Sequence, residues 1–238
     1  MSHLSRRSFF FASSGAAAGS FLVPGLAEAA EGNAFDYSQS GLSTGKLKPL
    51  KHKAIPGFLS AEQIAPHHTA HYGGALKTFM SIEAKFEESF AKGTAIDSMA
   101  FDAMQRTKSS RGNSVVLHEM YFDGLAMNGT DPMPDVRKVI EKRFGSLDKW
   151  AADFVTSAKS AAGWAMLVHH PVNGRLYNVV SDEHASGPMW MAVPIVVIDV
   201  YEHAFYIDYQ NRKPDYIEKF MQHIDWSEAN RRFRAAAS

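Results

Sequence analysis

The 238-residue sequence contains no cysteine. This absence excludes disulfide bonds, thiolate zinc sites, iron–sulfur clusters and cysteine nucleophiles. Any metal ion must therefore be held by histidine and carboxylate side chains. The chain has 11 histidines, so their placement along the sequence becomes the main question.

The chain also lacks net charge, because 25 lysines and arginines balance 25 aspartates and glutamates. After the first few residues the cations are scattered, so we expect no nucleic acid partner. Internal repeats and low-complexity tracts are absent as well. With 45% hydrophobic residues, the chain is long enough for one sizeable domain or two small ones with a hydrophobic core.

The amino terminus lacks the run of about 20 strongly apolar residues that a permanent membrane span needs. Phe9 to Leu26 is apolar but diluted with Ala, Gly and Ser, and Ala27-Glu28-Ala29 has the spacing that signal peptidase requires. The segment around Arg6 and Arg7, Ser-Arg-Arg-Ser-Phe-Phe, resembles the twin-arginine export signal. Residues 1–29 are therefore predicted to be a cleaved signal that the twin-arginine export machinery uses to deliver the folded protein to the periplasm. The alternative is a retained membrane anchor.

Helical patterns begin after a lead-in segment, 30–57, that is rich in Gly, Ser and Lys. Ser60 and Gln63 form a capping-box pattern, which predicts the start of a long helix. Apolar residues then recur at helical spacing to about Phe90, and Gly93 breaks the pattern. This segment is predicted to be the first arm of an α-hairpin.

The second arm is predicted in two pieces. A short helix is expected over 96–105, then a Ser-Ser-Arg-Gly loop, then a helix from Asn113 to about Met127. The turn cluster 128–132 is the predicted domain boundary. The predicted divisions are the signal peptide 1–29, the lead-in segment 30–57, an α-hairpin domain 58–130 and a C-terminal α+β domain 131–238.

The C-terminal part predicts helices followed by strands. Helices are expected over 134–143 and 146–161, and strands over 164–169, 175–181 and 191–200. Asn173-Gly174 indicates a β-hairpin between the first two strands, and helical patterns resume at Tyr201, with Pro214 and Asn230 marking later helix boundaries. The predicted fold class is α+β: an N-terminal long antiparallel α-hairpin followed by a C-terminal domain of helices with a three-stranded antiparallel sheet.

Several histidines and one aspartate have spacings that suit a metal site. His67 and His71 lie one turn apart on one helix face, and His118 lies inside the next long helix. An antiparallel hairpin would let His67 and His118 face each other. Asp199 ends an apolar strand, and His203 follows in the first turn of a helix. Three imidazoles and one carboxylate suit iron, manganese or zinc and match calcium or magnesium poorly.

Each histidine also has a structural interpretation. A single histidine on an apolar helix, such as His118, is more often a core residue with satisfied polar atoms. His67 and His71 by themselves would also suit an exposed face or a minor zinc site. The pair His169-His170, beside the hairpin turn, is expected to be exposed and structural. Spacing alone therefore leaves the metal site a hypothesis.

Longer motifs resemble the iron/manganese superoxide dismutase family. Its signature, D-x-W-E-H-A-Y-Y followed by a stretch ending N-x-R-P-D-Y, is similar to Asp199–Tyr206 and Asp208–Tyr216. Other similar segments are the amino-terminal motif His67–His71, the middle segments Phe144–Trp150 and Gly163-Trp164, and the closing helix Ile224–Asn230. The motifs occur in family order and span about residues 58–233.

The resemblance implies that one iron or manganese ion per subunit is bound by His67, His118, Asp199 and His203. It also implies a homodimer or tetramer whose interface contains His71, Glu202, His203 and Tyr206. In the family, the glutamate that Glu202 matches reaches the last histidine ligand of the partner subunit. Together with His184, considered below, His71 and Tyr206 are the predicted catalytic residues that surround the ligands.

Departures from the family pattern are concentrated around the metal. Ala75 stands where the family has a tyrosine at the active-site entrance. Tyr201 replaces the usual tryptophan of the signature, and Met166 replaces the second tryptophan of G-W-x-W. Lys213 replaces an arginine and keeps a positive charge that could guide an anion inward.

The family's glutamine that hydrogen-bonds the metal-bound solvent is also missing. One of its two usual positions is Ser114, and the other lies in the loop 181–187. His184 is predicted to be the solvent partner, and Glu183 is the competing choice because the loop length leaves a one-residue ambiguity. These changes bear on the reaction rate and redox potential more than on metal binding.

The resemblance implies a superoxide dismutase, which converts superoxide to dioxygen and hydrogen peroxide by redox cycling of a single iron or manganese ion. The altered entrance and solvent partner motivate an alternative, an exported metal-binding protein of the same fold with little or no dismutase activity. A third reading is a different metal-dependent oxidoreductase, because a fold does not fix a function.

Overall fold

The computed structural model describes residues 35–186 and 189–238, all within one compact unit, Asn33–Ser238. The predicted signal, residues 1–29, lies outside the described residues. The elements in chain order are α1 (Gly41–Thr44), α2 (Ala61–Pro66), the π-helix η1 (His67–Tyr72), α3 (Gly73–Lys92), α4 (Ser98–Asp123), α5 (Pro134–Phe144), α6 (Leu147–Ser160), β1 (Trp164–His170), β2 (Arg175–Ser181), β3 (Val193–Asp199), the 3-10 helix η2 (Glu202–Ala204), α7 (Tyr206–Tyr209), α8 (Lys213–Met221) and α9 (Trp226–Ala237). The predicted α+β class is confirmed.

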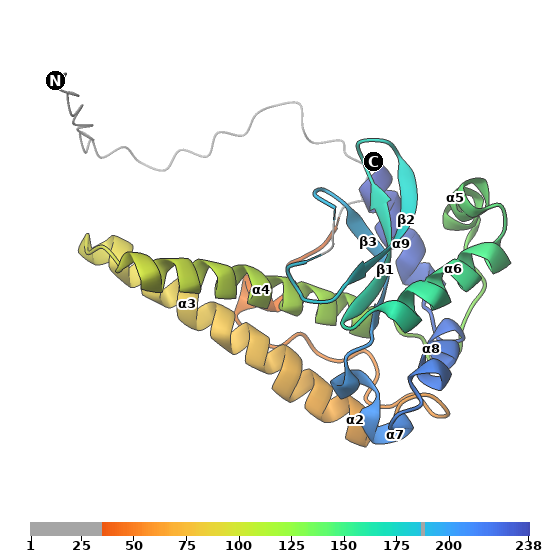
Figure 1. The fold of residues 1–238 in the computed structure, drawn as a ribbon, viewed down its shortest axis with the longest axis horizontal. Coiled ribbons are helices and arrows are strands. Elements are labelled where there is room, and N and C mark those ends of the chain that lie inside the picture. The colour runs from red at the N-terminus through yellow and green to blue at the C-terminus, as the bar shows by residue number, and fades with distance from the viewer. Residues whose placement is uncertain (1–34, 187–188) are drawn as a thin grey trace. The chain divides into compact units, whose positions relative to one another are not determined.

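Helices α3 and α4 lie side by side and form the predicted antiparallel hairpin (Figure 1). Gly93 ends α3 in the left-handed conformation, with φ of 61°, and its N–H donates to the Phe90 carbonyl. Asp97 begins α4, because its carboxylate accepts hydrogen bonds from the N–H groups of Met99 and Ala100. The short connection between these two caps brings the helices back along each other.

The loop predicted at Ser-Ser-Arg-Gly is wrong, because α4 runs through it without a break. A Cβ atom on Gly112 would lie 3.1 Å from the Phe79 ring on α3. The missing side chain therefore lets the two helices approach closely, and this packing outweighs the poor helix propensity of glycine and serine. The helix ends at Asp123, earlier than the predicted end near Met127.

The two helices predicted after the hairpin are confirmed as α5 and α6. Pro134 occupies the start of α5, and the Ser146 hydroxyl caps α6 by accepting a hydrogen bond from Lys149 N–H at 3.2 Å. The predicted helix boundary at Asn230 is wrong, because this residue lies inside α9. Its buried amide oxygen accepts from Val136 N–H at 3.3 Å, so it joins α9 to α5.

The sheet has three antiparallel strands, as predicted, and the structure shows their order to be β2-β1-β3. Gly174 adopts φ of 65° in the turn between β1 and β2, which explains the Asn-Gly signal. The register sets Trp164 on β1 opposite Ser181 at the end of β2 and opposite Asp199 at the end of β3. One end of the sheet therefore brings together an indole, the start of the loop after β2 and the carboxylate of Asp199.

The predicted exposure of the histidine pair is wrong for His169, whose exposed fraction is 4%. Its ring meets Phe233 of α9 edge to face, with centroids 5.6 Å apart. Helix α9 packs against β1 and β3 and covers this face of the sheet. A contact between such distant segments is not visible in the local sequence.

The lead-in segment is packed against the hairpin. Gly41 N–H donates to the buried Glu119 carboxylate at 2.7 Å, and the Tyr72 hydroxyl donates to the same oxygen at 2.8 Å. Lys48 forms an ion pair with Asp123 at 2.5 Å. The two hydrogen bonds compensate a buried carboxylate on α4, and the contacts together fix the start of the described chain to that helix.

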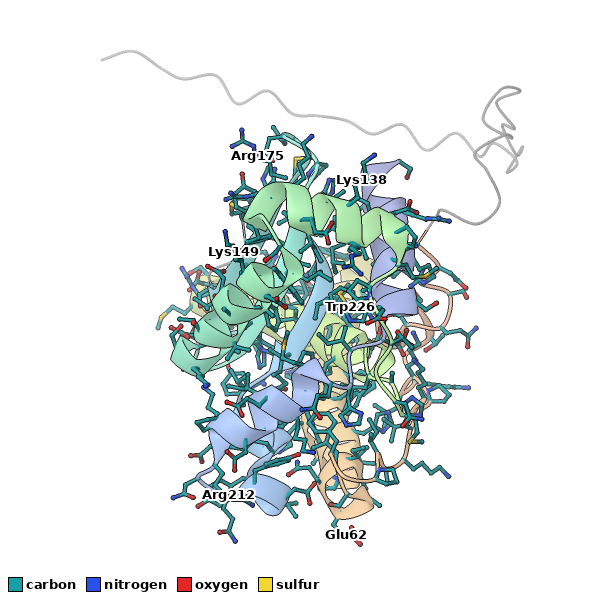
Figure 2. The ribbon with its side chains drawn as sticks, turned by 90° about the vertical axis from the view of Figure 1, so that its right-hand side faces the viewer. Glu62, Lys138, Lys149, Arg175, Arg212 and Trp226 are labelled. Atoms are coloured by element: carbon teal, nitrogen blue, oxygen red, sulfur yellow. The ribbon has the colours of Figure 1, made fainter. Side chains whose placement is uncertain are left out.

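Aromatic side chains fill the space between the sheet and its helices. Trp150 and Trp226 are nearly inaccessible and meet edge to face, with ring centroids 5.2 Å apart. Figure 2 shows Trp226 in the interior, whereas Lys149 and Arg212 project at the periphery. None of the described helices is both long enough and apolar enough to cross a membrane.

Candidate metal centre

Four side chains from four different elements converge on one point. One donor atom each from His67, His118, Asp199 and His203 lies within 4.8 Å of the others. They come from η1, α4, the end of β3 and η2. The first three are fully buried, whereas the His203 side chain is 20% exposed. The predicted ligand set is thus confirmed as a potential metal site, and its nitrogen and oxygen donors suit iron or manganese.

His67 begins a stretch of π-helix. Pro66, at the end of α2, lacks the N–H that would continue the ordinary hydrogen-bond pattern, and the chain widens into η1 directly after it. His67 and His71 both lie in this stretch, with ring centroids 6.2 Å apart and nearly perpendicular planes. The π-helix therefore directs one imidazole into the buried site and leaves the other exposed at its edge.

His118 is oriented by the backbone of its own helix. Its Nδ1 lies 2.7 Å from the Ser114 carbonyl oxygen, so the neutral ring carries its hydrogen there. Its Nε2 is buried and has no hydrogen-bond partner among the described residues. Burial lowers the pKa of His118 to about 3, which keeps the ring neutral. An unpaired lone pair held in this way is what a metal ligand needs.

Asp199 lies at the centre of the ligand set. Its Oδ2 is 3.2 Å from His67 Nε2, 3.3 Å from His203 Nε2 and 3.7 Å from His118 Nε2. Its Oδ1 accepts from Tyr201 N–H at 3.0 Å. Burial alone would raise the pKa of Asp199, but hydrogen bonds from His203 and His67 hold it below its usual range. The site therefore offers one negative charge among three imidazoles, which fits a cation.

His184 is the predicted solvent partner, and its ring lies near the ligands. The ring centroid is 6.2 Å from that of His118. Trp164 Nε1 donates to His184 Nδ1 at 3.0 Å, as the strand register allows. The competing residue, Glu183, is exposed, and its backbone is hydrogen-bonded to Ser186.

The other two predicted catalytic residues lie at the edge of the site. The ring of His71 stacks on His203, with centroids 3.9 Å apart and planes 13° from parallel. Burial lowers the pKa of His71 to about 4. Tyr206 begins α7 and is 50% exposed. Their predicted roles across a dimer interface stay predictions.

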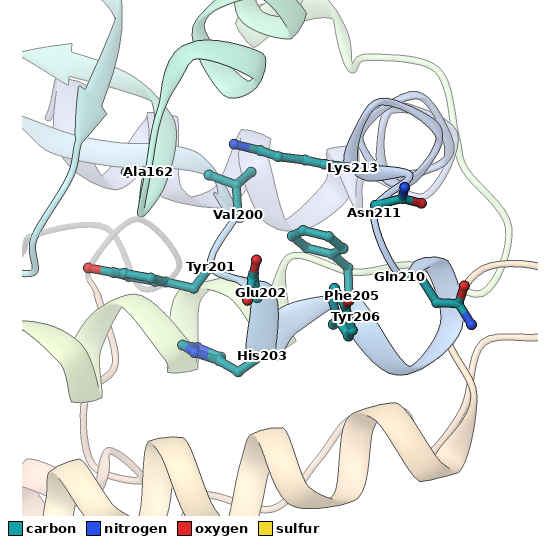
Figure 3. Close-up of a pocket in the computed structure, with 10 residues that line it drawn as sticks. All are labelled: Ala162, Val200, Tyr201, Glu202, His203, Phe205, Tyr206, Gln210, Asn211 and Lys213. Carbon is teal, nitrogen blue, oxygen red and sulfur yellow. The ribbon is translucent and has the colours of Figure 1, made fainter.

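An open pocket adjoins the last ligand (Figure 3). It is lined by Ala162, Val200, Tyr201, Glu202, His203, Phe205, Tyr206, Gln210, Asn211 and Lys213. Lys213 Nζ donates to the Ala161 carbonyl at 2.5 Å, and burial lowers the pKa of this ammonium. The ammonium is thus engaged by the backbone, and its predicted part in guiding an anion stays a prediction.

Gln63 is a site residue whose role the sequence interpretation missed. Ser60 caps α2 as predicted, since its hydroxyl accepts from Gln63 N–H at 3.1 Å. The Gln63 side chain, however, donates to the His203 carbonyl at 2.6 Å and accepts from Ile207 N–H at 3.0 Å. Only one of the two hydrogen bonds of a capping box is therefore present. The Ser60 N–H donates to the Asp208 carboxylate and not to the Gln63 side chain. The sequence did not indicate this contact between α2 and η2, because Gln63 and His203 are far apart in the chain.

The substituted positions around the metal are filled in different ways. Ala75 and Met166 are both buried, so no hydroxyl or indole stands at those places. Ser114 contributes its carbonyl to His118, while its hydroxyl lies 3.3 Å from the same nitrogen. Tyr201 stacks on His203 with ring centroids 5.2 Å apart.

Comparisons with known proteins agree with this geometry. Residues 132–232 match the model for the C-terminal domain of iron/manganese superoxide dismutases. The iron superoxide dismutase of Aquifex aeolicus is 35% identical over 198 residues, covering 80% of this chain and 92% of that protein. The manganese superoxide dismutase of Haloarcula marismortui is 30% identical over 191 residues, covering 80% of this chain and 93% of that protein. The relatives thus include enzymes named for each of the two metals.

Proposed function

This chain belongs to the iron/manganese superoxide dismutase family, and we propose that it works as an exported homodimer with His184 as the partner of the metal-bound solvent. The enzyme is an oxidoreductase that converts superoxide to dioxygen and hydrogen peroxide. The observation that carries this function is the buried convergence of three histidines and one aspartate. An iron or manganese ion held by His67, His118, Asp199 and His203 would supply the redox chemistry, since it can accept an electron from one superoxide and pass it to a second.

The ligands are prepared for a cation before it binds. The carboxylate of Asp199 offsets part of the positive charge of a divalent or trivalent ion. The Ser114 carbonyl fixes the hydrogen of His118 on Nδ1 and leaves Nε2 as the donor atom. Gln63 holds the turn that carries His203. The site therefore needs little rearrangement to accept the ion, which favours tight binding.

The hydrogen bond from Trp164 supports His184 as the solvent partner. An indole N–H can only donate, so His184 Nδ1 accepts. A neutral His184 then carries its hydrogen on Nε2 and is able to donate from there. Burial lowers the pKa of His184, which favours this neutral form. The Glu183 side chain is exposed, and its N–H donates to the Ser186 hydroxyl.

The proposed homodimer is supported by an exposed surface next to the last ligand. Glu202 and His71 are exposed there, together with Tyr206 at 50% and Ile207 at 56%. A two-fold arrangement would bring the partner subunit's Glu202 to His203 of this chain, and the same contact would recur in reverse. Light scattering on the purified protein is expected to give the mass of a dimer, and a monomer at micromolar concentration would contradict the proposal. A tetramer would retain this interface and add a second one.

The proposed export rests on the paired arginines and the Ala-x-Ala site of residues 1–29. Fractionated cells are expected to contain a shortened protein, cleaved near Ala29, in the periplasm. Replacing Arg6 and Arg7 with lysines is expected to retain the full-length protein in the cytoplasm. A full-length protein in the membrane fraction would favour the retained anchor instead.

Dismutase activity of the mature chain, loaded separately with iron and with manganese, tests the function directly. Metal content is measured on the same samples, so that rates are expressed per bound ion. We expect activity far above that of the free ions with at least one metal. Full occupancy with activity at the free-ion level would mean that Ala75, Tyr201 and His184 have turned the site into a metal-binding site without fast dismutation.

A further inference from the structure

Tyr201 contacts the metal centre and the loop after β2 at the same time. Its ring stacks on the ligand His203, with planes 14° from parallel. Its hydroxyl donates to the carbonyl oxygen of Asp182 at 2.9 Å. Figure 3 shows the Tyr201 ring extending above the His203 ring with its hydroxyl at the far end. One side chain thus joins a metal ligand to the segment that carries His184.

The reach of this phenol depends on Gly163. A Cβ atom at that position would lie 2.9 Å from both the hydroxyl oxygen and Cζ of Tyr201, and 2.6 Å from the Ser181 carbonyl oxygen. The absent side chain therefore leaves a slot through which Tyr201 passes to the loop. Asp182 is also fixed from the other side, because its carboxylate accepts from Ala162 N–H at 2.8 Å.

The loop after β2 is held by hydrogen bonds among its own residues. The Ser181 hydroxyl makes short contacts with the carbonyl oxygens of Glu183 and Ser186. Glu183 N–H in turn donates to the Ser186 hydroxyl at 3.2 Å. Because these bonds join both sides of His184, we expect a displacement of Asp182 to move the His184 ring as well. The His184 ring itself accepts a hydrogen bond from the Trp164 indole.

We propose that Tyr201 is a positioning residue that acts through His184: its hydroxyl fixes Asp182 and so holds the His184 ring in place against Trp164, beside the ligand His118. The proposal rests on the role proposed above for His184. Where the family usually has a tryptophan, this chain has a smaller phenol whose hydroxyl donates to the loop. His184, which stands in for the family's glutamine, and Tyr201, which replaces its tryptophan, would then act together.

A purely packing role for Tyr201 makes a different prediction. The stacking on His203 needs only the ring, so phenylalanine would serve equally well. The loop contact needs the hydroxyl. A single neutral hydrogen bond of this kind changes an equilibrium by about 2- to 12-fold. Tyr201→Phe therefore separates the two roles, because it keeps the ring and removes only the hydroxyl.

The test uses the iron-loaded mature chain, with azide as a small anionic probe of the iron site. Tyr201→Phe is expected to leave metal content unchanged. It is expected to speed amide hydrogen exchange at residues 182–186 by about 2- to 12-fold and to shift azide affinity in the same direction as His184→Ala, by a smaller factor. Tyr177→Phe is the matched control, since it removes a hydroxyl that accepts from Asn173 at the other end of β2. We expect this control to alter neither reading.

The double variant Tyr201→Phe/His184→Ala tests whether Tyr201 affects azide binding through His184. If Tyr201 acts through His184, its substitution adds no further change in azide affinity once His184 is gone. Additive effects would overturn the proposal, as would wild-type exchange and azide affinity in Tyr201→Phe alone. If His184→Ala itself leaves azide affinity and dismutation rate unchanged, the role of His184 is wrong and this proposal fails with it. An effect of His184→Ala without any effect of Tyr201→Phe refutes only the positioning role.

Discussion

The ligand side of the metal centre and its solvent side are held by different kinds of structure. On the ligand side, regular elements and the buried core fix the donors: α4 carries His118, and β3 ends in Asp199. On the solvent side, His184 belongs to a partly exposed loop that is held by Trp164 and Tyr201. Substitutions on the ligand side are therefore expected to reduce metal binding, and substitutions on the solvent side to reduce turnover while the metal is retained.

The same division separates what this chain shares with its family from what it changes. The donor residues match the family motifs, whereas the departures lie among the residues around them, such as Ala75, Tyr201 and His184. Residues that surround metal ligands tune affinity or activity by about 10- to 100-fold. The comparison therefore predicts that metal retention and reactivity are under separate control here.

The largest expected effect is the loss of a donor on the ligand side. His118→Ala should lower metal affinity by more than about 100-fold, because it removes more than the 10- to 100-fold that supporting residues contribute. Metal per chain, measured by mass spectrometry after dialysis, checks this. His170→Ala serves as the control and should keep its metal. A His118→Ala protein with full occupancy would break the comparison.

The next effect concerns the proposed subunit contact at Glu202. Truncating one partner of a hydrogen-bonded charge pair costs about 2 kcal/mol or more, or roughly 30-fold in the dissociation constant. Glu202→Ala should therefore shift the dimer toward monomers over a dilution series in analytical ultracentrifugation. Glu218→Ala, an exposed residue on α8, is the matched control. An unchanged dimer in Glu202→Ala would place the interface elsewhere.

The next effect lies far from the metal, at Glu228, and concerns the free energy of unfolding. Its carboxylate accepts from the buried Arg232 at 2.8 Å. Burial would raise the pKa of Glu228, but hydrogen bonds from Arg231 and charge from Arg232 lower it below 4.5. Glu228→Gln should cost about 1.5–3 kcal/mol of unfolding free energy at neutral pH and leave metal content unchanged.

The unfolding free energy that Glu228→Gln loses should decrease as the pH falls. The ionised Glu228 stabilises the folded state above the unfolded pKa, and the contribution disappears as the pH falls through the lower folded value. The stability difference between wild type and Glu228→Gln should therefore be constant near pH 7 and shrink below pH 4.5. Urea unfolding at several pH values measures it, and the metal contribution cancels in the difference. A difference that grows in acid would contradict the ion pair.

The smallest effect is expected at Ser114, although it lies next to a ligand. His118 is oriented by the Ser114 carbonyl at 2.7 Å, whereas the hydroxyl is a weak partner at 3.3 Å. Ser114→Ala keeps the carbonyl, so metal affinity should change by less than about threefold, well below the usual 10- to 100-fold. A competition titration with a chelator measures this affinity. A tenfold loss would show that the hydroxyl is the true partner.

The sequence predicted the ligand set because its motifs place each donor at a defined point of a helix or strand. It also predicted the hairpin, the sheet and the caps at Ser60 and Ser146, since these depend on local patterns. The antiparallel pairing of β1 with β2 followed from the Asn-Gly turn, whereas the position of β3 beside β1 is known only from the structure.

The failures share one physical cause, which is packing between segments far apart in the chain. Gly112 suggested a loop, but it is the contact that lets α3 and α4 meet at Phe79. His169 is buried because α9 covers it, and Gln63 turns from its own helix to the turn of His203. Local propensity contains no information about these partners.

Metal content and turnover per bound ion, measured side by side for Asp199→Asn and His184→Ala, test the central claim most directly. The account predicts that Asp199→Asn loses both its metal and its activity. His184→Ala should keep the metal and lose turnover per ion by about 10- to 100-fold. If His184→Ala keeps full turnover, or loses its metal as Asp199→Asn does, then the two sides of the centre are not under separate control.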